Sequence, residues 1–135
     1  FGDDKLKELF KLTNTKFVSG DYVGAFNTTM KALSIAEKNK DCYWMSFGNL
    51  QLGGLNYYFK KKEIALQNYY LAMRYADSCK LEKIDYRIYH DIGVIYVEQD
   101  LVDSALKYMN RTVERLKGTK KHSYLSNTYC VLSVL

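Results

Sequence analysis

The sequence predicts an all-α protein, a right-handed α-solenoid in which about three antiparallel helix pairs and a final helix stack in series. Apolar residues recur along the chain at spacings of three and four, the period of a helix with one buried face. The 135 residues include no proline, the residue that most strongly disrupts helix interiors. A fixed long period is typical of stacked helical repeats. Four sets of positions show a period of 40 residues: Ala25, Ala65 and Ala105; Leu12, Leu52 and Ile92; Ala32, Ala72 and Thr112; and Ala36, Ala76 and Leu116.

The first two repeats each divide into two helices around a short turn. In the first repeat, residues 1–40, a Ser-Gly-Asp sequence at 19–21 separates two stretches of helical periodicity. Glycine and aspartate favour turns, so this signal is strong. In the second repeat, residues 41–80, three lysines at 60–62 occupy the corresponding position.

The third repeat, residues 81–120, follows the same plan around a turn at 100–102. Residues 121–135 continue the pattern as one helix of a partial fourth unit. All four units together make one predicted domain, residues 1–135. The predicted helices are 3–18, 22–38, 42–59, 63–79, 84–99, 103–117 and 121–135.

Small residues recur where neighbouring helices must approach closely. Ala65 permits a short distance between the two helices of its repeat, and Gly53 and Gly93 have the same effect from the first helices. A glycine inside a helix costs about 1 kcal/mol relative to alanine, so tight packing is the expected compensation. We expect large residues to fill the space beside these small ones: Tyr69 and Met109 on second helices and Tyr96 on a first helix.

These residues resemble the tetratricopeptide repeat family. Its pattern of Leu-Gly, a small residue, an aromatic residue and a second alanine is similar to the second repeat, and the resemblance covers essentially the whole chain. The matching positions are Leu52, Gly53, Ala65, Tyr69 and Ala72; Ile92, Gly93, Tyr96 and Ala105; and Gly20, Tyr22, Ala25, Ala32 and Leu33.

The chain also departs from that family. The usual repeat has about 34 residues, so we interpret the period of 40 as lengthened helices. Thr13 and Lys16 replace the glycine and tyrosine in the first repeat, while Met109 and Thr112 replace the aromatic residue and alanine in the third. HEAT and armadillo repeats are closer to 40 residues, but their prolines are missing here and the small-residue pattern is present.

The resemblance implies a non-catalytic module that binds a protein or peptide in a concave groove lined by the first helix of each repeat. Aromatic residues and arginine are common energetic anchors of such interfaces. An aromatic stripe at helical spacing is also typical of a core, so burial of Phe10, Phe17 and Leu50 is the alternative. The groove positions implied are Lys7, Phe10, Asn14, Phe17, Phe47, Leu50, Gly54, Tyr57, Tyr58, Arg87, His90, Val94, Val97, Asn127 and Cys130.

Two further implications concern the kind of partner and the parent protein. A clamp for a peptide carboxylate would need several cationic and amide positions in consecutive repeats, and only Lys7, Asn14 and Arg87 fit. The long, tyrosine-rich repeats are similar to arrays in bacterial sensor kinases and transcription regulators. This similarity implies a sensory or regulatory module within a larger signalling protein.

The sequence predicts no catalytic, cofactor or metal site. His90 and His122 are the only histidines, and neither belongs to a set of ligands at metal-binding spacing. Gly53 and Gly54 fall inside a predicted helix, so they do not form a phosphate-binding loop. We therefore do not expect an enzyme.

Charge and hydropathy narrow the possible partners. The chain has 20 Lys and Arg against 15 Asp and Glu, a net charge of +5 that is spread along the sequence. A nucleic-acid binder more often concentrates its charge on one face, so the spread charge favours a protein partner. An RNA-binding helical array is the alternative function. No apolar run reaches the length of about 18 residues typical of a membrane span, and we expect no membrane contact by this segment. The compartment, cytoplasmic or periplasmic, stays open.

Both ends interrupt a helical pattern, which suggests a fragment of a longer protein. The apolar residues at 131–135 would need another helix or a second copy to cover them, so self-association through the terminal helices is a further possibility.

Three cysteines are an odd number without metal-type spacing, which argues against a disulfide framework. Cys42 begins the first helix of the second repeat and Cys79 ends the second helix. Antiparallel packing would bring both cysteines to the same end of the helix pair, so a disulfide between them is geometrically feasible. It would require an oxidising compartment.

Overall fold

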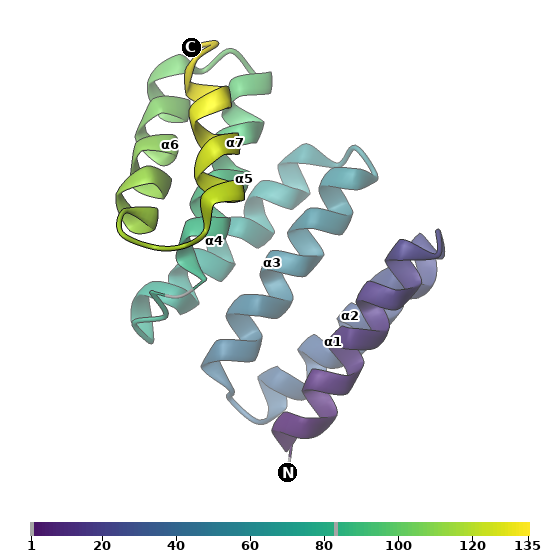
Figure 1. The fold of residues 1–135 in the computed structure, drawn as a ribbon. Helices are drawn as coiled ribbons and strands as arrows, with labels where there is room; N and C mark the ends of the chain where they lie inside the picture. The colour runs from purple at the N-terminus through teal and green to yellow at the C-terminus, as the bar shows by residue number, and fades with distance from the viewer. Residues whose placement is uncertain (1, 83) are drawn as a thin grey trace. The chain divides into compact units, whose positions relative to one another are not determined.

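The computed structural model describes residues 2–82 and 84–135 (Figure 1). These residues form seven α-helices and no strand, which confirms the all-α prediction. Every helix end lies within three residues of its predicted position. The helices are α1 (Gly2–Val18), α2 (Tyr22–Lys38), α3 (Cys42–Tyr58), α4 (Lys62–Ser78), α5 (Asp85–Glu98), α6 (Val102–Leu116) and α7 (His122–Leu132).

The chain divides into two compact units. The N-terminal unit contains α1 to α4 and ends at Cys79, while the C-terminal unit begins at Lys80 and contains α5 to α7. Within each unit, every helix packs against the next one along the chain. This pattern is consistent with a helical repeat arrangement. The unit boundary coincides with the end of the second 40-residue repeat, and the grouping of all repeats into a single domain stays a prediction.

The turns after the first five helices share one backbone conformation. At each turn one residue has a positive φ. After the left-handed residues Gly20, Lys40, Lys60 and Asp100, the next N–H donates to a carbonyl five positions earlier. Asp41 N–H donates to the Ala36 carbonyl at 2.9 Å, for example. This is the Schellman ending of a helix. The left-handed residues recur every 20 positions: Gly20 (φ 89°), Lys40 (53°), Lys60 (63°), Lys80 (54°) and Asp100 (58°).

Two of the following helices begin with an aspartate cap. The Asp21 carboxylate accepts a hydrogen bond from the Gly24 N–H at 2.9 Å, and Asp41 accepts one from the Trp44 N–H at 3.2 Å. Each bond satisfies one of the N–H groups that a helix leaves without a partner in its first turn. The start of α3 is therefore fixed at a defined position in the sequence.

The small residues lie where the sequence predicts close helix packing. Ala25, Ala65 and Ala105 are fully buried. A Cβ atom built on Gly53 would lie 2.6 Å from the Tyr69 ring, and one on Gly93 would lie 2.8 Å from the Met109 methyl group. The expectation that Tyr69 and Met109 fill the space beside the glycines is confirmed.

Adjacent glycines in α3 should respond to alanine with opposite signs. Gly53→Ala forces the buried Tyr69 ring to move, and overpacking of about 1–3 kcal/mol exceeds the helix-propensity gain of about 1 kcal/mol. At Gly54 the nearest atom, Tyr69 Oη, is 3.9 Å from the added carbon, so Gly54→Ala should stabilise by about 0.5–1 kcal/mol. Urea denaturation measures both changes, and equal shifts of the same sign would contradict this packing.

In the C-terminal unit, an ion pair between a buried aspartate and an exposed arginine joins α5 to α6. Arg115 Nε lies 2.9 Å from Asp85 Oδ2, and the Asp85 side chain is 4% exposed. Tyr96 and Tyr108 also stack across this helix pair, with ring centroids 5.8 Å apart. Charge and ring contacts together hold the two helices in register.

Candidate functional site

A hollow with an aromatic lining lies between α1 and α3 of the N-terminal unit. It has a volume of about 820 Å³ and is open to solvent. We call it the α1–α3 groove. Its lining residues are Asp4, Lys7, Glu8, Phe10, Lys11, Asn14 and Thr15 from α1, and Tyr43, Trp44, Phe47 and Gln51 from α3.

Four aromatic rings form the floor of this groove. Phe10 stacks on Trp44 at 5.1 Å between ring centroids and meets Phe47 edge to face at the same distance. Tyr43 lies parallel to Phe47 at 6.1 Å. Such offset and edge contacts are favourable arrangements for aromatic rings. Phe10 and Trp44 are buried, while Tyr43 is 39% exposed, so Tyr43 presents ring surface to a ligand.

Trp44 is held through both its backbone and its side chain. Its backbone N–H is capped by Asp41, and its indole Nε1–H donates to the carboxylate of Asp3 on α1. Because the ring also stacks on Phe10, its orientation is set by contacts from two helices. The groove floor is therefore ordered before any ligand arrives.

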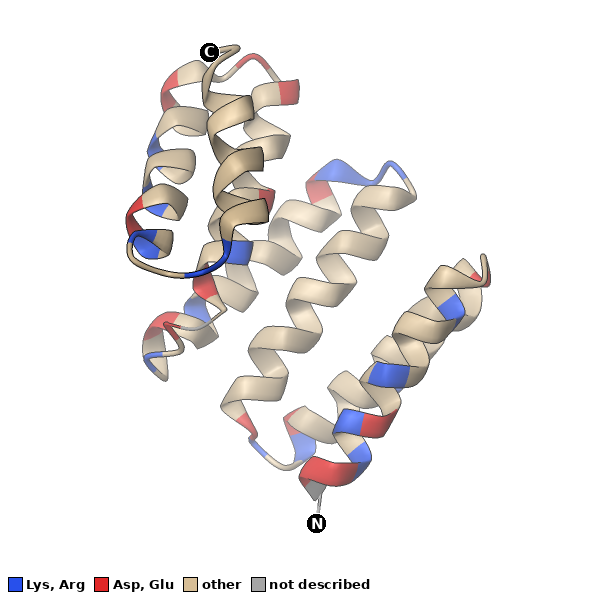
Figure 2. Ribbon diagram, in the orientation of Figure 1, with Lys and Arg blue, Asp and Glu red and all other residues tan. Residues whose placement is uncertain are grey.

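Charges along the groove alternate in sign. Lys7 and Lys11 line the groove together with Asp4 and Glu8, and Lys7 pairs with Asp3 at 3.8 Å. Figure 2 shows this alternation of basic and acidic residues along α1, and a basic turn between α3 and α4. Near-neutral walls do not favour a strongly charged ligand.

The part of the groove farther along both helices carries amide groups. Asn14 is exposed and Gln51 is half-buried, and a side-chain amide both donates and accepts hydrogen bonds. These two amides can therefore bind peptide N–H and C=O groups. The Thr15 hydroxyl cannot donate to a ligand in the same way, because it already donates to the Lys11 carbonyl at 3.1 Å.

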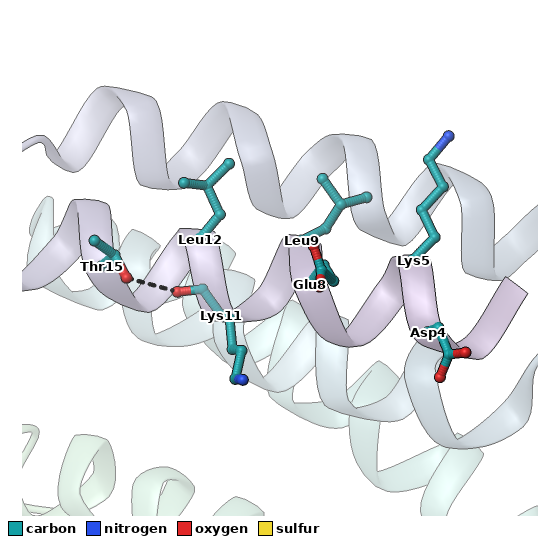
Figure 3. A pocket seen from close by; sticks show the side chains of 7 residues that line it. All are labelled: Asp4, Lys5, Glu8, Leu9, Lys11, Leu12 and Thr15. Atoms are coloured by element: carbon teal, nitrogen blue, oxygen red, sulfur yellow. Dashed lines mark hydrogen bonds between the residues drawn. The ribbon is translucent and has the colours of Figure 1, made fainter.

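A second hollow, of about 700 Å³, lies along α1 alone. Figure 3 shows that Leu9, Leu12 and Lys5 project from one side of the helix, with Asp4 and Lys11 on the other. A single helix supplies the whole lining, so ligand-binding groups do not converge on it. We regard it as a surface depression.

The sequence-predicted residues Phe17 and Tyr58 lie in a separate aromatic cluster with Tyr22. Ring centroids are 5.3 Å apart for Phe17 and Tyr22, 5.6 Å for Phe17 and Tyr58, and 4.4 Å for Tyr22 and Tyr58. A hydrogen bond with Tyr22, assisted by desolvation, raises the pKa of Tyr58 above its usual value. Tyr57 is half-buried, and Leu50 is 3% exposed, so Leu50 packs in the core.

The remaining predicted residues belong to the C-terminal unit. His90 Nδ1 lies 3.2 Å from Thr128 Oγ1, and the His90 ring meets Tyr124 edge to face at 5.3 Å. Arg87 and Val94 on α5 are half-buried, and Asn127 on α7 is exposed. Two further expected groove positions of this unit are Val97, which is half-buried, and Cys130, which is exposed. Gly54, on α3 of the N-terminal unit, is half-buried.

Burial of His90 makes the C-terminal unit sensitive to acid. Burial lowers the pKa of His90 below its usual value near 6.5, so the folded state favours the neutral ring. The stability contributed by neutral His90 is complete above the unfolded pKa and is lost as pH falls through the folded pKa. Thermal melts should therefore show a larger loss of stability between about pH 7 and about pH 5 for the parent than for His90→Asn.

His122→Asn is the matched control for this measurement, because His122 is the other histidine and is exposed. It should keep the parent's pH response. An identical response in the parent and His90→Asn would contradict the burial of a neutral imidazole at this position.

Four predicted residues, Lys7, Phe10, Asn14 and Phe47, meet in the α1–α3 groove. Sequence reasoning missed Tyr43, Trp44 and Gln51, because the positions were transferred from the family pattern. The spacing of 43, 47 and 51 is a clear signal in retrospect, since residues four apart share one helix face. The aspartate cap at 41 also marked where α3 begins.

The chain matches no protein-family model, and no curated protein resembles it closely enough to count as a relative. Among the described residues, no helix combines the length and the apolar character that crossing a membrane requires. The geometry of the α1–α3 groove is therefore the main basis for a functional proposal.

Proposed function

We propose that the chain is a non-catalytic module that binds a short peptide segment of a partner protein in the α1–α3 groove. The observation that supports this proposal most strongly is the ordered aromatic floor of Phe10, Tyr43, Trp44 and Phe47. A preorganised site loses little conformational entropy on binding, and this favours affinity.

The groove chemistry favours one class of peptide. An aromatic or aliphatic anchor side chain would pack against the exposed ring of Tyr43 and the half-buried ring of Phe47. The amides of Asn14 and Gln51 would then bind the peptide backbone. Because the charged walls are nearly balanced, a neutral or weakly charged segment fits better than a polyanion.

The test uses peptides selected from a displayed random library against the folded chain. Affinity is then measured by fluorescence anisotropy for the parent and for Tyr43→Ala. Truncation of a central aromatic anchor typically costs 2 kcal/mol or more, so we expect binding to weaken by at least about tenfold. Trp44 is the only tryptophan, and its emission should shift on binding.

Two exposed tyrosines serve as controls. Tyr58→Ala changes the separate aromatic cluster of the same unit, and Tyr129→Ala changes α7. Both should retain parental affinity. A peptide lost with Tyr58→Ala but retained with Tyr43→Ala would place binding at the Phe17–Tyr22–Tyr58 cluster and refute the proposed groove.

Salt dependence separates this proposal from an RNA-binding array. Peptide binding through a near-neutral aromatic groove should change little between about 50 and about 200 mM salt, whereas binding through several phosphate contacts weakens by orders of magnitude. Tight RNA retention that salt abolishes would favour the alternative. The wider role as a regulatory module of a signalling protein rests on the family resemblance alone.

A further inference from the structure

Cys42 and Cys79 form a disulfide that closes the open end of the α3–α4 helix pair. Cys42 is the first residue of α3, and Cys79 follows the last residue of α4. Their Cα atoms are 6.4 Å apart, within the usual range of about 4.4–6.8 Å for disulfides. The Lys60 turn joins α3 and α4 at the other end, so the helix pair is covalently connected at both ends.

This disulfide adjoins the floor of the α1–α3 groove. Cys42 directly precedes Tyr43 and Trp44, and all three lie in the first turn of α3. Farther along, α3 is joined to α4 by the buried Ser46 hydroxyl, which donates to the Ala72 carbonyl at 2.8 Å. On the N-terminal side of Ser46, the disulfide links the first turn of α3 covalently to the end of α4.

The disulfide is accessible to a reductant. Cys79 is exposed and Cys42 is half-buried, so a thiolate can approach the Cys79 sulfur from solvent. Accessible disulfides exchange more readily than enclosed ones. Cys79 is also the last residue of the N-terminal unit, which places the link where the chain passes into the C-terminal unit.

We propose that the Cys42–Cys79 disulfide is a redox-controlled clasp that ties the first turn of α3 to the end of α4 and, together with the α1 contacts of Trp44, keeps Tyr43 and Trp44 in place. A dithiol reductant would then lower the affinity of the groove for its peptide. A dithiol supplies two electrons and two protons. The Cys42–Cys79 bond breaks, both sulfurs become thiols, and the dithiol is oxidised to its own disulfide. The affinity part of this inference rests on the proposed function, whereas the ordering of Trp44 does not.

The first measurement counts thiols and follows the single tryptophan of the full chain. Before reduction only the exposed Cys130 should react, giving one free thiol, and after dithiothreitol the count should be three. Iodide quenching of Trp44, which is 7% exposed when oxidised, should then increase about twofold, because local opening admits the quencher. Amide exchange at 43–46 should accelerate, while exchange in α2 stays unchanged.

Two variants control this result. Cys130→Ser should respond to reductant as the parent does, since Cys130 lies on α7 and is free. The pair Cys42→Ser and Cys79→Ser should match the reduced parent and ignore the reductant. Should that pair fail to fold, the reduced parent still provides the comparison, because it is reduced after folding.

Peptide affinity completes the test. A peptide that binds the oxidised chain should bind the reduced chain about tenfold more weakly, through lost preorganisation. Equal Trp44 quenching in the two states, or three free thiols before reduction, would overturn the clasp. If Trp44 quenching changed on reduction while peptide affinity stayed equal, the disulfide would not control the groove, and the proposal of peptide binding would be unaffected. If the library yields no peptide, the proposed function fails, and Trp44 quenching alone decides the clasp.

Discussion

Replacing both Cys42 and Cys79 by serine is expected to lower the free energy of unfolding by about 2–4 kcal/mol under oxidising conditions. The disulfide links residues 37 positions apart, so it restricts many conformations of the unfolded chain. Serine removes that restriction but keeps the size of the side chains. Urea denaturation, followed by helical circular dichroism, measures the change.

The same experiment contains its own check. Cys130→Ser should leave stability within about 0.5 kcal/mol of the parent, as is usual for an exposed position. Reduction of the parent should reproduce the stability of the doubly substituted chain. A parent whose unfolding midpoint ignores reductant would show that the disulfide contributes nothing measurable.

Ala65→Leu is expected to destabilise the N-terminal unit by about 1–3 kcal/mol through overpacking. Ala65 is fully buried, and Tyr69 lies one helical turn farther along the same face of α4. The Tyr69 ring already occupies the space above Gly53, so three added carbons require α3 and α4 to separate. Thermal or urea denaturation measures the loss.

Two comparisons make that result specific. Ile64→Leu alters the neighbouring residue, which is 46% exposed, and should be nearly neutral. Ala25→Leu and Ala105→Leu alter the equivalent buried positions of the other repeats and should be similarly destabilising. If Ala65→Leu and Ile64→Leu were equally harmless, the close packing of α4 against α3 would be wrong.

Helix positions were predictable because the apolar period of each helix is visible in the sequence. A buried stripe at helical spacing and a turn every 20 residues set all seven helices. Gly20, Asp21, Asp41 and Gly118 are the turn and cap residues with a clear compositional signal. Lys40, Lys60, Lys80 and Asp100 are left-handed without being glycine. At these turns the packing of successive helices must offset the local cost of the conformation.

The candidate site was less predictable, because burial depends on neighbouring helices rather than on one helix face. Phe47 and Leu50 both lie on α3, yet Phe47 reaches the groove and Leu50 packs in the core. The place of Trp44 in the groove floor depends on its stacking against Phe10 of another helix, which the pattern of α3 alone does not indicate. Antiparallel packing predicted that Cys42 and Cys79 lie close together. The sequence did not predict that they form a disulfide.

The regular recurrence of left-handed turn residues limits how this chain can change its length. Adding one residue to α3 after Gly53 would rotate all that follows by about 100° and advance it by about 1.5 Å. Tyr69 would then no longer face Gly53, and Cys79 would move away from Cys42. Insertions are therefore tolerable only at the turns, and new binding specificity must arise by side-chain replacement on helices of fixed length.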